Sequence, residues 1–388
     1  MTLETLQTLF NNHKEAHLYH RYIHSEHIQS LLEKHHHHFK IETIGTSVLG
    51  EPISVIQMGS GAKKIMMWSQ MHGNETTTTK AVFDLCNVFA DTNNAIIDAI
   101  LEKCTIAIIP MLNPDGAKAY TRVNANNVDL NRDAQDLSQP ESQALRDFFN
   151  RFQPNFCFNL HGQRTIFSAG TTNKSATVSF LAPAQDEACT ITDTRKMAME
   201  IIVEMNENLQ QQIPNQVGIY DDAFNINCVG DTFQSLNVPT ILFEAGHFTD
   251  DYPREIVREF IFQSLLISIN YIANRTVTCE NFEPYLQIPQ NAKCFYDIII
   301  RNALVDTEIG EQITDMAIQY QERLEENRIE FIPIVEHIGN LDAFFGHLDI
   351  DAKSQKVVSE KNEPIKVVNE IVFVLINNKR IALKPKKI

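Results

Sequence analysis

The chain has 388 residues and a formal net charge of −16, with 43% hydrophobic and 21% charged residues. This length allows about two or three domains, and the composition is ordinary for a globular protein with a sizeable core. A surface this acidic repels the phosphates of nucleic acid and of anionic membranes, so we expect neither as a partner.

Cysteine usage and the N-terminal residues indicate the cellular compartment. Seven cysteines are scattered along the chain, and none forms a Cys-x-x-Cys pair. Reduced thiols fit a reducing compartment and argue against a zinc site built on thiolates. The first residues lack the basic start and apolar run of a signal peptide, and no stretch approaches the ~18 apolar residues that cross a bilayer. We therefore expect a cytoplasmic protein, and the oligomeric state stays open.

Helical and strand-like segments alternate over the first 280 residues. The first forty residues have loosely helical apolar spacing, and strand-like runs follow at 39–45 and 52–59. Short apolar runs that suit buried strands then alternate with helical stretches, the second of which opens with a Ser-x-x-Glu capping box. This order predicts an α/β fold with a mixed central β-sheet flanked by helices. The apolar runs are Ile65–Trp68, Thr105–Pro110, Phe156–Leu160 and Thr240–Phe243, and the helical stretches are Thr76–Phe89 and Ser138–Phe152.

The pattern changes near residue 280, where two prolines and the lack of a clear period indicate a linker. We expect a main domain over residues 1–280 and a smaller accessory domain, α/β or β-rich and of unknown role, over residues 281–388. In the smaller domain, Asn377 and Asn378 form the turn of a predicted hairpin. An amphipathic helix is also predicted there from the spacing of Ile313, Met316, Ala317, Tyr320 and Leu324.

Reactive polar side chains directly follow several of the apolar runs. His72 and Glu75 follow the first run, His161 follows the third and Glu244 follows the fourth. Ligands of open α/β sheets bind at the carboxyl ends of the strands, so these side chains can converge there. A histidine and a glutamate three residues apart can face the same way, and His161 would complete a three-ligand zinc site with an open fourth position. Glu244 is then the candidate to take a proton from water and pass it to a leaving amine.

Each of these residues taken alone also has a structural interpretation. A single histidine such as His72 is more often a capped surface residue, and Glu244 after a buried strand could be a salt-bridge partner. Arg132 could form an ordinary ion pair with Asp133 or Glu141. The occurrence of two histidines and two glutamates in this order favours the zinc site.

Five motifs in order resemble those of the zinc metallocarboxypeptidases, the family of carboxypeptidase A. They are His72-Gly-Asn-Glu75, Asn113-Pro-Asp-Gly116, Val128-Asp-Leu-Asn-Arg132, Leu160-His161-Gly162 and Phe243-Glu244. The resemblance implies that residues 1–280 form a catalytic domain that binds one Zn²⁺ per chain. The roles that it implies are metal binding by His72, Glu75 and His161, catalysis by Glu244 and Arg122, substrate binding by Asn131, Arg132 and Tyr220, and orientation of His72 by Asp129.

Three positions depart from the family pattern or lack a distinctive motif. Relatives commonly have asparagine where this chain has Asp133, and the added carboxylate is expected to weaken carboxylate binding or to select a cationic group. Arg122 precedes Asn131 by only nine residues and could be a solvated arginine. Tyr220 could be a packing tyrosine. The floor of the substrate pocket is expected within Asn225–Thr232, where Asn227, Cys228 and Val229 carry no decisive charge.

The resemblance implies a zinc-dependent hydrolase that cleaves a peptide or isopeptide bond next to a free C-terminal carboxylate. The alternative is a zinc-dependent deacylase or amidase that acts on small N-acyl compounds or cell-wall peptides. A remote third alternative is a non-catalytic binding module, which the competent residue at every catalytic position disfavours. The expected partner is a peptide or small amide with a free carboxylate. The run of histidines at 35–38 favours a solvated helix end over a second metal site.

Overall fold

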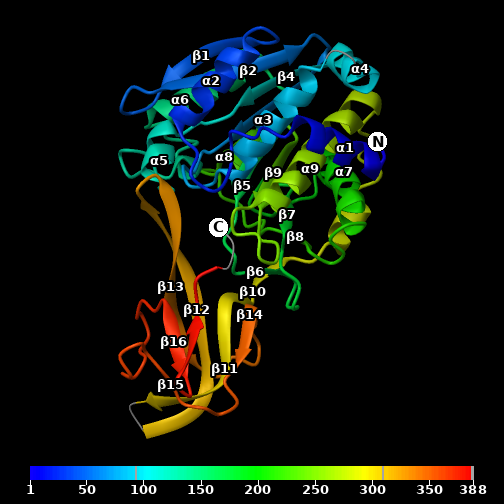
Figure 1. Cartoon of the computed structure of the whole chain (residues 1–388). Coiled ribbons are helices and arrows are strands. Elements are labelled where there is room, and N and C mark those ends of the chain that lie inside the picture. The colour runs from blue at the N-terminus through cyan, green and yellow to red at the C-terminus, as the bar shows by residue number, and fades with distance from the viewer. Residues whose placement is uncertain (92–93, 308–309, 386–388) are drawn as a thin grey trace.

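The computed structural model describes residues 1–91, 94–307 and 310–385 (Figure 1). The larger part of the molecule contains α1 (Leu3–His13), α2 (Ser25–His35), β1 (Lys40–Thr46), β2 (Pro52–Gly59), β3 (Lys63–Ser69), α3 (Thr77–Phe89), α4 (Ala95–Lys103), β4 (Cys104–Ile109), α5 (Pro114–Ala119), η1 (Leu130–Arg132), α6 (Pro140–Phe152), β5 (Phe156–Gly162), β6 (Phe167–Ala169), β7 (Val178–Leu181), α7 (Asp193–Gln210), β8 (Val217–Ile219), α8 (Val229–Ser235), β9 (Thr240–Ala245), α9 (Glu255–Asn274) and η2 (Glu283–Gln287). The C-terminal part contains β10 (Asn291–Lys293), β11 (Phe295–Thr307), β12 (Gly310–Glu325), β13 (Arg328–Gly339), β14 (Phe345–Asp351), β15 (Val357–Val358), β16 (Phe373–Ile376) and β17 (Lys379–Ala382).

The main sheet has eight strands in the order β1-β2-β4-β3-β5-β9-β7-β8. Strands β4, β3, β5 and β9 are parallel neighbours, whereas β1 pairs with β2, β2 with β4 and β7 with β9 in antiparallel fashion. The sheet is therefore mixed, which confirms the predicted fold class. Parallel strands end at the same edge, so side chains that follow them can meet there.

Helices cover both faces of this sheet, and the side chains of β3 show how. Ile65 and Met67 pack in the cluster that contains α3 and α9, whereas Met66 and Trp68 pack in the cluster that contains α6 and α8. Successive side chains of a strand point to opposite faces. A strand that is buried on both faces therefore needs a continuous apolar run, which is why the run Ile65–Trp68 predicted β3.

Helix α9 is long and apolar because it is a core helix. By length and composition it qualifies as a membrane span, with a mean hydropathy of 1.3, so the expectation that no stretch approaches such a span is corrected. Of this apolar window, however, 78% is buried inside the protein. The helix begins at the carboxylate of Asp251, which accepts hydrogen bonds from the backbone N–H groups of Glu255, Ile256 and Val257 at 2.8–3.0 Å.

Helix α6 does not begin with the predicted capping box of Ser138 and Glu141. Gln139 is the N-cap residue, and no side chain caps the helix from that position. Glu141 is buried, and its carboxylate accepts hydrogen bonds from the backbone N–H of Val48 and the side-chain amide of Asn124, both at 3.1 Å. The carboxylate of Glu141 therefore binds residues far away in the chain instead of the backbone N–H groups at the start of its own helix.

The C-terminal part is built from strands, so the amphipathic helix predicted around Ile313–Leu324 is wrong. These residues belong to β12, which pairs with β11 and β13 in a sheet of order β13-β12-β11-β14. Met316 and Ile318 pack in one cluster and Ala317 in another, which is the two-residue period of a strand. Pairing with other strands outweighed the local helical spacing. The β-rich alternative for this part is confirmed.

The predicted hairpin turn at Asn377 and Asn378 is confirmed. Strands β16 and β17 pair in antiparallel fashion on either side of it, and the two asparagines have φ angles of 48° and 63°. A two-residue turn with positive φ at both positions matches the twist of a hairpin, and asparagine tolerates that conformation.

The C-terminal part contacts the larger part through several groups of residues. Ile288, just before β10, packs in the main core, and β10 pairs with β6. Near the turn between β12 and β13, Ile329 and Phe331 pack with Tyr22, Tyr120 and Tyr252 of the larger part. The remaining C-terminal strands extend away from the main sheet (Figure 1). The domain boundary at residue 280 stays a prediction.

A buried ion pair joins α9 to α3 and to the N-terminal segment. Arg258 donates hydrogen bonds to both carboxylate oxygens of Asp84 at 2.6 Å, and to the backbone oxygens of Leu18 and Glu15. Asp84→Ala should lower the free energy of unfolding by about 3–5 kcal/mol, because it removes the carboxylate that accepts two hydrogen bonds from a buried guanidinium and leaves Arg258, among the described residues, only the carboxylate of Glu255, at 3.2 Å. Urea denaturation measures this loss. Asp147→Ala on the exposed side of α6 is the matched control, and equal losses in the two variants would contradict the prediction.

Candidate metal centre and substrate cleft

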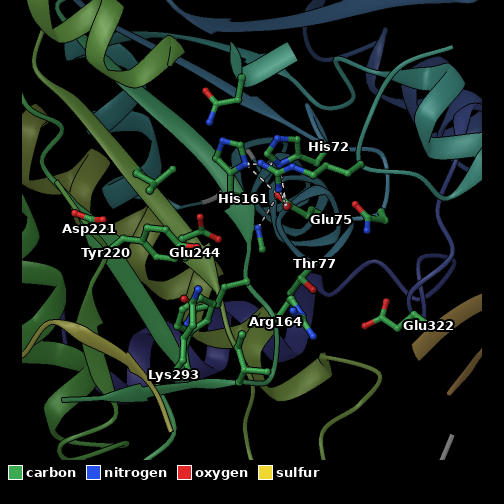
Figure 2. A pocket seen from close by; sticks show the side chains of 18 of the residues that line it. His72, Glu75, Thr77, His161, Arg164, Tyr220, Asp221, Glu244, Lys293 and Glu322 are labelled. Atoms are coloured by element: carbon green, nitrogen blue, oxygen red, sulfur yellow. Dashed lines mark hydrogen bonds and ion pairs between the residues drawn. The ribbon is translucent and has the colours of Figure 1, made fainter. Parts of the chain in front are cut away.

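Four side chains meet at the carboxyl ends of β3, β5 and β9. His72 lies in the loop after β3, Glu75 precedes α3, His161 belongs to β5 and Glu244 to β9. His161 and Glu244 are direct neighbours across the β5–β9 pair. Figure 2 shows the first three side chains pointing toward one another with Glu244 beside them. Parallel strand order thus brings together residues that lie far apart in the chain.

The turn after His72 has room only for glycine. A Cβ atom on Gly73 would lie 1.9 Å from the carbonyl carbon of Gly116. Asn113 caps α5 by accepting a hydrogen bond from the backbone N–H of Gly116 at 2.9 Å, and its amide donates to the backbone oxygen of Met71 at 3.1 Å. The Asn-Pro-Asp-Gly motif therefore supports the backbone that carries His72.

The ligand atoms of His72, Glu75 and His161 all lie within 4.8 Å of one another. His72 Nδ1 is 2.9 Å from Glu75 Oε1, and His161 Nδ1 is 3.0 Å from Glu75 Oε2. The two Nδ1 atoms are 3.1 Å apart, and both imidazoles are buried. Two imidazoles and one carboxylate facing a common point form the donor set of a catalytic zinc site. A divalent ion fits this cluster, because it would bond the lone pairs that face one another.

Asp129 and Arg122 lie behind the cluster. Asp129 Oδ1 is 3.0 Å from His72 Nε2, and Arg122 Nε donates to Asp129 Oδ2 at 3.0 Å. A carboxylate on the far nitrogen of a ligating histidine fixes its tautomer and its orientation. Burial lowers the pKa of His72, but the carboxylates of Glu75 and Asp129 outweigh burial and raise it overall. Arg122 Nη1 also reaches Glu75 Oε1 at 3.5 Å, so this arginine lies at the cluster rather than free in solvent.

Glu244 has a buried carboxylate oxygen without a hydrogen-bond partner among the described residues. Its side chain is 8% exposed. Burial and the nearby carboxylate of Glu75 raise the pKa of Glu244 well above its usual range. A buried polar atom without a partner costs free energy, and perturbed carboxylates of this kind concentrate at functional sites. No salt bridge of Glu244 is present among the described residues, which disfavours the structural interpretation.

The model of the zinc carboxypeptidase family matches residues 24–227, more than half of the chain. This chain belongs to the zinc carboxypeptidase family. The matched range contains His72, Glu75 and His161 and ends before Glu244.

Individual curated relatives align with shorter stretches of this chain than the family model does. Carboxypeptidase SOL1 of Arabidopsis thaliana is 31% identical over 141 residues, which cover 32% of this chain and 29% of that protein. Gamma-D-glutamyl-L-diamino acid endopeptidase 1 of Lysinibacillus sphaericus is 36% identical over 80 residues, which cover 19% of this chain and 20% of that protein. This chain thus spans less than a third of the length of these curated relatives. Carboxypeptidase A of Helicoverpa armigera shares the fold, with a TM-score of 0.52 and 14% identity over 70% of this chain and 80% of that one.

In this zinc carboxypeptidase family member, Asn131 and Arg132 form the expected carboxylate clamp, and both contact the start of α8. Asn131 Oδ1 accepts a hydrogen bond from the backbone N–H of Val229 at 3.0 Å. The guanidinium of Arg132 is exposed, and one of its nitrogens donates to Cys228 Sγ at 3.1 Å. The structure shows no ion pair between Arg132 and a carboxylate among the described residues, so its charge is available to a substrate.

Asp133 does not add a free carboxylate to this clamp. It is buried, and it accepts hydrogen bonds from the backbone N–H and hydroxyl of Ser138 and from the backbone N–H of Gln139. The expectation that Asp133 weakens carboxylate binding or selects a cationic group is corrected. Its carboxylate is fully used in holding the chain where α6 begins.

Tyr220 follows β8 and lines the same cleft as the metal cluster. Its ring centroid is 5.5 Å from that of Phe167, so it packs as well as facing the cleft. Burial and the carboxylates of Glu244 and Glu75 raise the pKa of Tyr220 to about 12. Its hydroxyl therefore stays a hydrogen-bond donor at neutral pH.

The cleft is a cavity of about 1100 Å³ that joins the two parts of the chain. Every expected site residue except Asp129 lines it. Its far wall is formed by residues of β12 and β13, among them Gln319–Arg323 and Ile334. Sequence reasoning missed these residues because no motif marks them, and only the docking of the hairpin brings them to the site.

The floor expected within Asn225–Thr232 contributes Asn225, Cys228, Gly230 and Asp231 to the cleft. Asp231 supplies a charge that the sequence interpretation overlooked. Its side chain is buried, and burial raises its pKa to about 6. A single aspartate at the start of a short helix carries no sequence signal of its own.

Proposed function

We propose that this protein is a zinc metallocarboxypeptidase, which removes the C-terminal residue of a peptide or cleaves an isopeptide bond next to a free carboxylate. The observation that supports this best is the buried cluster of His72, Glu75 and His161 beside Glu244, whose buried Oε2 has no hydrogen-bond partner among the described residues. One zinc ion per chain would occupy the cluster.

The chain's own residues account for the proton transfers and for charge stabilisation. When bound, zinc supplies a Lewis acid that polarises the carbonyl of the scissile bond. Glu244 accepts a proton from the attacking water and returns it to the amine of the leaving residue. Arg122, whose Nη2 has no partner among the described residues, donates to the oxygen that gains negative charge. Asp129 holds His72 in place throughout.

Binding of the substrate terminus falls to the clamp. The guanidinium of Arg132 forms a planar fork that matches a carboxylate, and Asn131 adds an amide donor beside it. Tyr220 lines the same cleft and offers its hydroxyl to the substrate. Positioning of this kind supplies a large part of the barrier reduction, because the substrate no longer has to find the reactive geometry by diffusion.

Arg132→Gln tests the clamp. This change should lower kcat/KM for peptides with a free carboxyl terminus by roughly 30-fold or more, because a charge-assisted contact with the substrate is lost. Steady-state hydrolysis of matched free and amidated peptides measures the effect, and the wild type should leave the amidated series uncut. Arg151→Gln, an exposed arginine on α6, is the control. Equal cleavage of free and amidated peptides would count against a carboxypeptidase.

The second candidate is a zinc amidase that acts on cell-wall peptides or small N-acyl compounds. The similarity to a gamma-D-glutamyl-L-diamino acid endopeptidase favours it. Both candidates need the same metal cluster and Glu244, so they differ only in whether the terminal carboxylate is required. The amidated series of the preceding experiment therefore separates them.

A cytoplasmic location remains part of the proposal. All seven cysteines are free thiols, as expected in a reducing compartment. Cell fractionation with an antibody against the whole protein tests it, and recovery outside the cytoplasm would contradict it.

A further inference from the structure

Arg164 and Lys293 line the cleft, and neither has a side-chain partner among the described residues. Arg164 follows β5, three residues beyond His161, and Lys293 ends β10. Both side chains are exposed, and neither forms a hydrogen bond or ion pair among the described residues. Figure 2 labels both of them in the part of the cavity below Glu244.

Other cations of the same cavity already have partners. Arg122 pairs with Asp129, and Arg323 pairs with Glu370 at 2.9 Å. Arg21 pairs with Glu322 at 2.9 Å. Arg164 and Lys293, like Arg132, have no carboxylate partner among the described residues, and they keep an uncompensated charge in a chain whose net charge is −16. Free positive charge inside a cleft attracts anions to it.

The backbone that carries these two cations is held in place. Lys293 is the β-pair neighbour of Phe167, three residues after Arg164. The hydroxyl of Thr165 is 2.7 Å from Gln319 Nε2, and its backbone oxygen is 2.8 Å from His347 Nε2. The C-terminal part thus fixes the segment that directly follows Arg164. A fixed backbone positions a charge more sharply than a mobile loop does.

The two cations and the clamp line the same cleft but belong to different parts of the fold. Leu130 and Val229, which flank the clamp, pack on the face of the sheet that α6 and α8 cover. Lys293 belongs to β10, which pairs with β6, the strand that follows Arg164. When the terminal carboxylate of a peptide lies at Arg132 and its scissile bond at the cluster, the N-terminal side of the peptide has to occupy the rest of the cleft, which Arg164 and Lys293 line.

We propose that Arg164 and Lys293 form a subsite for a carboxylate side chain, so that the protein prefers substrates with an acidic residue on the N-terminal side of the scissile bond. This rests on the proposed function, because it takes that bond to lie at the metal cluster. Each cation donates to the substrate carboxylate, and the guanidinium of Arg164 can do so through two N–H groups. Lys293 belongs to the C-terminal part, which thereby takes part in substrate selection.

Two series of peptides test the subsite. They end in the same free C-terminal residue and carry glutamate, glutamine or lysine at the first or the second residue before the scissile bond. The full-length wild type should cleave the better glutamate peptide with a kcat/KM roughly fivefold above its glutamine counterpart, and the lysine peptide should be poorest. Raising the salt concentration should reduce the preference, because exposed charge pairs are screened.

Variants connect the preference to the two side chains. Arg164→Gln and Lys293→Gln should each reduce the glutamate preference, and the double variant should abolish it while still cleaving the glutamine peptide. Lys293→Glu should favour the lysine peptide. Lys353→Gln, an exposed lysine of the C-terminal part outside the cleft, should leave the preference unchanged. A wild type that cleaves all three peptides equally, or a double variant that keeps the preference, overturns the proposal.

The proposed function can fail separately from the subsite. If no peptide of either series is cleaved, the metallocarboxypeptidase proposal fails, and the same peptides are titrated against the wild type and the double variant by calorimetry. Tighter binding of the glutamate peptide that disappears in the double variant supports the subsite even then. Equal affinities for the three peptides overturn it.

Discussion

Glu244→Gln should reduce kcat for peptide hydrolysis by roughly 10³-fold or more, because general acid–base catalysis by one side chain contributes on this scale. Glutamine has nearly the same shape, so the burial and the packing of the site are kept while the proton acceptor is lost. Zinc content should stay unchanged, since Glu244 is not in the cluster of three ligands. Replacing a buried charge next to Glu75 also removes a repulsion, and the melting temperature should not fall.

Hydrolysis of a peptide with a free C-terminus, together with metal analysis, measures this result. Glu102→Gln on the exposed side of α4 is the matched control and should keep full activity. Wild-type activity in Glu244→Gln would show that another group takes the proton. Loss of zinc along with activity would show that Glu244 belongs to the metal site itself.

His161→Ala should lower the zinc content from about one ion per chain to background, because a catalytic zinc site has three protein ligands and this change removes one. A metal bound only by the folded state adds stability, about 4 kcal/mol when its free concentration is 1,000 times its Kd. Chelation should therefore lower the melting temperature of the wild type, and added zinc should restore it. The melting temperature of His161→Ala should respond to neither treatment.

The histidine run at 35–38 supplies the control for this experiment. His36, His37 and His38 are exposed as expected, but His35 is buried and stacks on Phe39 and Phe83, so the solvated interpretation holds for three of the four. His37→Ala should keep the zinc content and the response to chelation. If it loses the metal instead, the ion is bound at the run, and the cluster is not the metal centre.

Much of the larger part was predictable because its information is local. The apolar run Ile65–Trp68 predicts a strand buried on both faces, and the reactive residues that follow it predict a site at the strand ends. The chemical roles of these residues do not follow from their positions. That His72 binds zinc and Glu244 moves a proton are still predictions, because proximity alone does not demonstrate chemistry.

Local pattern failed where a distant partner decided the structure. The helical spacing around Met316 yields to pairing along β12, since strands satisfy their backbone hydrogen bonds with other segments of the chain. Asp133 looked like part of the clamp because it is adjacent in sequence, yet its hydrogen bonds turn it toward the start of α6. Neither outcome can be read from neighbouring residues.

The sequence by itself determined the class of fold, the order of the motifs and the residue types available for a zinc site. Only the tertiary structure decided that the β12–β13 hairpin lines the cleft and that Arg164 and Lys293 face it with no partner in the part of the chain that the structure describes. The physical reason is that burial, pairing and charge compensation belong to side chains that meet in space. Which of them meet is settled when the separate parts pack together.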